Sequence, residues 1–138
     1  MYISTLVAEV QKTLLMLRAE HGEYRLAMLY NSDVGAQTNW NLIISSEWTD
    51  RMGIPQATRA IARELYKGLS PENKDALSRV TVLRTDDPFV EDMMNLYPEI
   101  GENTGVPFKQ VTAGGINEGG AFVFYLRPRS KSEVASTE

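Results

Sequence analysis

The chain has 138 residues, a net charge of −4 and a sequence pI of about 5.1. It is long enough for one domain with a hydrophobic core, and its acidic balance argues against binding to a nucleic-acid backbone. The absence of cysteine excludes disulfides, thiolate zinc sites and cysteine nucleophiles, and the single histidine, His21, leaves other zinc sites short of ligands.

The first part of the chain predicts one helix and two strands. Apolar residues recur at helical spacing over 3–20, and Gly22 is a typical residue at the end of a helix. Segments 24–30 and 40–46 are rich in aromatic and aliphatic residues and predict two strands. Because only a short polar loop connects them, we expect these strands to be antiparallel. Three consecutive apolar residues in the second strand indicate burial on both faces, so we expect this strand to be central.

The middle of the chain predicts three helices around a third strand. Proline at the first helical positions and suitable caps place helices at 53–68, 70–77 and 88–97. The strand is 79–85, between the second and third of these helices. Because helices join it to the preceding strand, we expect a parallel pair with a right-handed crossover.

The remaining sequence predicts two further strands and a tail. Strands 106–112 and 121–127 flank the glycine-rich segment 113–120, so this segment predicts a hairpin. It does not match a phosphate-binding loop, because it lacks the Gly-Lys-Ser/Thr ending and leads into a strand. Segment 128–138 has no apolar periodicity and predicts a disordered tail. The globular domain is therefore expected to span 1–127.

These elements follow the order α-β-β-α-α-β-α-β-β and predict an α+β fold. We expect a single mixed sheet of about five strands with helices packed on it. Alternation along the last strand places Phe122, Phe124 and Leu126 on one face. Val123 and Tyr125 are expected on the other face.

Polar residues follow two strands that should be neighbours. Ser45, Ser46 and Glu47 end the second strand, and Asp86 and Asp87 follow the third. Since ligands bind beyond the carboxyl ends of parallel strands, the serines are candidate ligand-binding residues and the acids are candidate catalytic residues. Their oxygens suit Mg²⁺ or a polar substrate. The alternative is that these residues are helix caps.

The first helix, the first two strands and the loop between these strands are similar to part of a known protein family. Helix, strand, serine-containing loop, strand, helix and strand in this order resemble the minimal nucleotidyltransferase fold. In that family a Gly-Ser pair follows the first strand, and three acids on later strands bind Mg²⁺. Asn31 and Ser32 stand in place of Gly-Ser, which makes Ser32 a further candidate for ligand binding. Asn39, Asn41 and Thr81 stand in place of the acids. The resemblance thus implies a module without nucleotide transfer, because neutral side chains cannot replace carboxylates at divalent ions.

The favoured function is that of a small soluble binding or adaptor domain without catalysis, acting as a homodimer or with a protein partner. No metal or cofactor is expected for it. The alternatives are a Mg²⁺-dependent nucleotide- or phosphate-binding enzyme that uses the acids at the strand ends, and a degenerate nucleotidyltransferase-like module. The sequence contains no signal peptide pattern and no apolar run of about 20 residues, so we expect a cytoplasmic protein without membrane contact.

Overall fold

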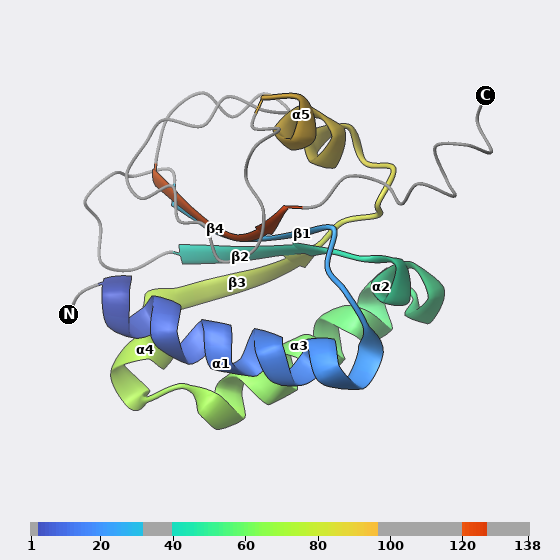
Figure 1. Cartoon of the computed structure of the whole chain (residues 1–138). Coiled ribbons are helices and arrows are strands. Elements are labelled where there is room, and N and C mark those ends of the chain that lie inside the picture. The colour runs from blue at the N-terminus through green and yellow to red at the C-terminus, as the bar shows by residue number, and fades with distance from the viewer. Residues whose placement is uncertain (1–2, 32–39, 97–119, 127–138) are drawn as a thin grey trace, which may run out of the picture.

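A computed structural model describes residues 3–31, 40–96 and 120–126 of the protein. Figure 1 shows one β-sheet with α1, α3 and α4 on one face and α5 on the other. None of the helices in the described ranges is long and apolar enough to cross a membrane. In chain order, the elements are α1 (Ile3–His21), β1 (Leu26–Asn31), β2 (Trp40–Ser45), α2 (Glu47–Met52), α3 (Ile54–Gly68), α4 (Pro71–Ala76), β3 (Leu77–Val82), α5 (Pro88–Leu96) and β4 (Gly120–Leu126).

The sheet is mixed, with strand order β3-β2-β1-β4. β1 is antiparallel to β2 and to β4, whereas β2 and β3 are parallel. The predictions of an α+β fold, of a central second strand and of a parallel crossover are therefore confirmed. The described part of the sheet has four strands. The strand predicted at 106–112, the hairpin residues 113–119 and the predicted tail lie outside the described residues.

Helix α2 was not expected and follows directly from the end of β2. Ser46 is its N-cap, and the Ser46 hydroxyl accepts a hydrogen bond from the Thr49 backbone N–H at 3.1 Å. In return the Thr49 hydroxyl accepts from the Ser46 N–H, also at 3.1 Å. This reciprocal pair satisfies two backbone donors at the helix start, which stabilises a helix of only six residues.

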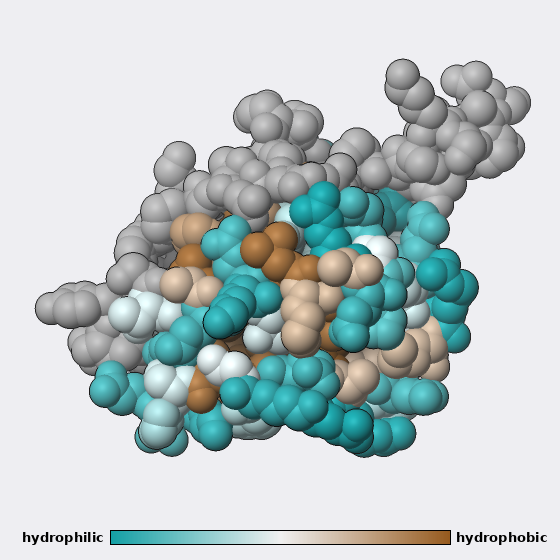
Figure 2. All heavy atoms as spheres, turned by 60° about the horizontal axis from the view of Figure 1, so that its bottom comes forward, coloured by the Kyte–Doolittle hydropathy of each residue, from teal (hydrophilic) through white to brown (hydrophobic). Residues whose placement is uncertain are grey.

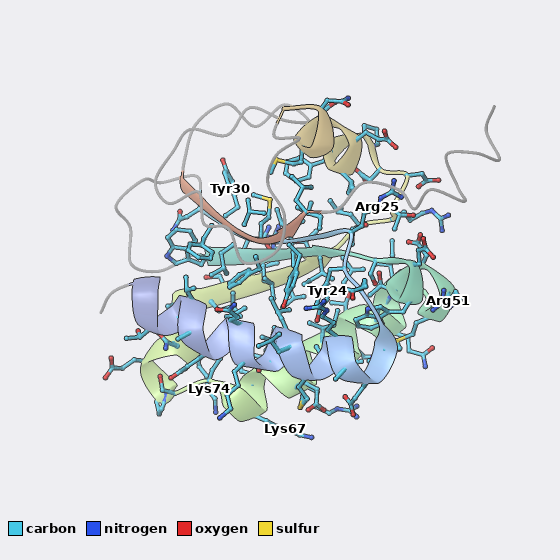
Figure 3. All side chains as sticks on the ribbon, in the orientation of Figure 1. Tyr24, Arg25, Tyr30, Arg51, Lys67 and Lys74 are labelled. Carbon is cyan, nitrogen blue, oxygen red and sulfur yellow. The ribbon has the colours of Figure 1, made fainter. Side chains whose placement is uncertain are left out.

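Two hydrophobic clusters hold the helices on the sheet. The larger lies beneath α1 and α3, where the Tyr24 hydroxyl donates a 2.8 Å hydrogen bond to the Leu14 carbonyl oxygen. Figure 3 shows Tyr24 between α1 and the sheet. The smaller cluster joins α5 to the other face of the sheet through Phe89, Val90 and Met93. Burial on both faces explains why β1 and β2 are almost continuously apolar.

The predicted alternation along the last strand is wrong beyond Phe124, because β4 contains a bulge. Val123 and Tyr125 pair with adjacent residues of β1, so Phe124 is an extra residue between them. Phe124 and Tyr125 consequently both enter the cluster beneath α1. Leu126 belongs to the cluster beneath α5, opposite to its expected face.

Glu9 connects α1 to the start of α4. Its Oε1 accepts a 2.8 Å hydrogen bond from the Ser70 backbone N–H and a 2.9 Å bond from Asn73 Nδ2. The hydrogen bond from Asn73, followed by that from Ser70, lowers the pKa of the Glu9 carboxyl below its ordinary value. The charged form of Glu9 is therefore the form that the folded protein favours.

We expect Glu9→Gln to lower the free energy of unfolding at pH 7 by on the order of 1 kcal/mol. A carboxyl whose pKa is lowered by folding stabilises the protein above its ordinary pKa of 4.5, and this contribution disappears as the pH falls through the folded pKa. Urea unfolding at pH 7 and pH 3 should therefore show a variant effect that shrinks in acid. Glu20→Gln, at an exposed position of α1, is the control. An equal loss at both pH values would contradict the role of the charge.

Candidate functional site

The carboxyl ends of β2 and β3 lie at the same edge of the sheet, because the strands are parallel neighbours. The predicted serines there are both fully buried. The Ser46 side chain is the N-cap of α2, where it accepts a hydrogen bond from the Thr49 N–H. The Ser45 hydroxyl has no hydrogen-bond partner within the described part of the chain. Neither hydroxyl is therefore presented to solvent in this structure.

The three predicted acids follow the ends of β2 and β3, and Asp86 and Asp87 interact with different partners. Glu47 is exposed in the first turn of α2. Asp86 is exposed and forms a 3.2 Å ion pair with Arg84. Asp87 accepts a 2.8 Å hydrogen bond from the Phe89 backbone N–H and thereby caps α5. Within the described ranges, no three histidine, aspartate or glutamate side chains are grouped so that they could hold a metal ion. A role for these acids in binding Mg²⁺ stays a prediction.

Three of the residues that were compared with the nucleotidyltransferase motif are described, namely Asn31, Asn41 and Thr81, and the last two contact each other. Asn41 on β2 accepts a 3.0 Å hydrogen bond from the Thr81 hydroxyl on β3. This pair is neutral and lacks the charge that two divalent ions need. Ser32 and Asn39 lie outside the described residues.

A pocket of about 110 Å³ lies between α3 and the strand β3. Apolar atoms form most of its lining, although its rim contains polar side chains. Tyr66 stands at this rim and is 50% exposed. We call this feature the α3–β3 groove, and it is lined by Thr58, Ala62, Leu65 and Tyr66 of α3 and by Leu77, Ser78, Arg79 and Val80 of β3.

The strand that borders the α3–β3 groove is also an edge of the described sheet. The Leu83 N–H bonds to the Ile44 carbonyl oxygen at 2.8 Å, so Leu83 directs its backbone groups toward β2. Backbone groups alternate along a strand, so Val80 and Val82 direct their N–H and C=O groups away from β2. An apolar pocket and outward-facing backbone groups thus lie side by side.

The two elements that form the groove, α3 and β3, carry a net positive charge, although the whole chain is acidic. α3 and β3 together contain four cationic residues and one acidic residue. The acid, Glu64, forms a 3.2 Å ion pair with Lys67, and Figure 3 shows Lys67 on the side of α3 away from the sheet. Arg79 is among the residues that line the groove, but Val80 packs on the cluster beneath α3, so alternation along β3 directs the Arg79 side chain toward the opposite face of the sheet. Arg59 and Arg63 are exposed and precede groove residues by three positions, which places them at its margin.

The sequence alone does not predict this groove. The available signal was a stripe on α3 in which Thr58, Ala62 and Tyr66 recur every four residues beside the buried stripe of Ala57, Ile61 and Leu65. A second stripe that combines small and aromatic residues indicates a helix surface that is covered only in part.

The chain was compared with protein-family models, with curated proteins and with solved structures, and none of them matches.

Proposed function

We propose that this protein is a binding module that takes an extended segment of a partner protein onto the outer edge of β3. The single observation that carries the proposal is the position of the apolar pocket directly beside β3, which is an edge of the sheet in the described part of the chain. In strand addition, hydrogen bonds between main chains supply affinity, and a pocket for a side chain supplies specificity. The α3–β3 groove combines both elements.

The face formed by α1, α3 and α4 offers less for binding. Figure 2 shows it as a largely hydrophilic surface that is interrupted by apolar residues. Leu15 and Met16 on α1 and Ile54 on α3 are exposed to about 40–45%, which is ordinary for single surface residues. None of these residues adjoins outward-facing strand groups, so the groove is the stronger candidate.

The proposal is tested by selecting from a random peptide library with the full chain as bait. We expect extended peptides to be enriched, and the enriched peptides to bind the wild type in fluorescence polarisation. Val80→Pro removes an outward-facing N–H while leaving the hydrogen bonds to β2, since proline is tolerated on edge strands. Ala62→Phe fills the pocket. Each variant should weaken binding at least about tenfold, the equivalent of about 1.4 kcal/mol.

The matched control is Ala19→Phe, which adds the same side chain at an exposed position of α1. It should leave binding unchanged. Circular dichroism of each variant separates loss of the groove from loss of the fold. The proposal is overturned if no peptide is enriched over bait-free selection, or if both groove variants bind as tightly as the wild type.

A further inference from the structure

We infer that the α3–β3 groove binds an extended acidic segment whose side chains point alternately to its two sides. One apolar side chain of this segment enters the pocket, and a carboxylate lies two residues away from it. This inference rests on the proposed function and specifies the chemistry of its partner. The observation that carries this inference is the set of arginines around the groove, because binding of an extended segment does not by itself require them.

The position of the carboxylates follows from strand geometry. In an added strand, residues two positions apart point to the same side. When one side chain enters the pocket beside Ala62 and Val80, its neighbours two positions away also point toward α3. Arg59 and Arg63 lie at that margin of the groove, and neither forms an ion pair with another described residue. A carboxylate at these positions can form a charge-assisted hydrogen bond with a guanidinium.

The same arginines disfavour pairing of β3 with a second copy of itself. Two β3 strands related by a two-fold axis would bring Arg79 of each copy to the same short interface, together with both sets of α3 arginines. Charged residues on an edge strand act in this way to prevent association between like edges. Glu72 and Asp75 on α4 precede the Leu77 end of β3 and are acidic, so the cationic part of the groove is its margin at Arg59 and Arg63.

The test uses three labelled nonapeptides in which valine and threonine alternate around a central valine. The residues two positions before and after that valine are both glutamate, both glutamine or both lysine. We expect the glutamate probe to bind the full chain about threefold to tenfold more tightly than the glutamine probe, and the lysine probe to bind most weakly. The preference should decrease with added salt.

A charge exchange makes the test specific. The double variant Arg59→Glu/Arg63→Glu should reverse the order and favour the lysine probe. Arg51→Glu, at an exposed position of α2, is the control and should preserve the order of the wild type. Figure 3 shows Arg51 beyond the end of the sheet, away from α3's later turns.

The outcomes separate the two proposals. Equal binding of all three probes, with sensitivity to Val80→Pro, would leave the groove as a docking site and overturn the preference for acid. Failure of all three probes to bind would count against the docking site and therefore against both proposals. A dimer in analytical ultracentrifugation that Val80→Pro dissociates would show that the occupant is a second copy, and would overturn the acidic segment.

Discussion

Phe124→Ala is expected to lower the free energy of unfolding by about 3–5 kcal/mol, the range for removing a large aromatic side chain from a core. Phe124 is fully buried beneath α1, and the β-bulge directs its neighbour Tyr125 to the same side. Phe122, on the same strand, is only partly buried against this cluster. Phe122→Ala should therefore cost clearly less, even though the two rings contact each other at a centroid distance of 5.2 Å.

Urea unfolding followed by circular dichroism measures both variants. If Phe124→Ala leaves too little folded protein, Phe124→Leu provides a milder form of the same test. It should still be destabilising, by on the order of 1 kcal/mol. Equal losses at positions 124 and 122 would contradict the difference in burial that the structure shows.

Asp50→Ala is expected to lower the free energy of unfolding by about 2–3 kcal/mol. The Asp50 carboxylate in α2 accepts a hydrogen bond of 2.6 Å from the Thr85 hydroxyl and longer ones of 3.2 and 3.3 Å from the Thr85 backbone N–H. These bonds join α2 to the segment that follows β3. Their loss leaves the Thr85 donors unpaired at a partly buried position.

This experiment also tests whether Asp50 takes part in a magnesium site beside the acids at the strand ends. A structural link predicts that Asp50→Ala destabilises the protein equally with and without Mg²⁺, and that Thr85→Val shows coupling with it in a double-mutant cycle. A magnesium site predicts instead that Mg²⁺ stabilises the wild type and that the variant loses this effect. Asp75→Ala, at an exposed position of α4, is the control. Absence of destabilisation at position 50 would contradict the structural link.

Local patterns in the sequence were sufficient for most helices and strands, because periodicity and caps act over a few neighbouring residues. The helix predicted at 53–68 agrees with α3 to within one residue, and the consecutive apolar residues of β2 correctly indicated a central strand. The parallel relation of β2 and β3 followed from the helical connection between them. The capping role of Asp87 followed from its position before Pro88 and is confirmed by its hydrogen bond, whereas the capping role of Ser46 became visible only in the structure.

The sequence by itself thus determined an acidic, cysteine-free α+β domain and the chain order of most of its elements, since these depend on composition and on short-range patterns. Only the tertiary structure decided the bulge at Phe124, which requires pairing with β1, and the α3–β3 groove. The groove requires β3 to be an edge of the described sheet and α3 to pack beside it. Both conditions depend on contacts between distant segments, and no local pattern of residues specifies them.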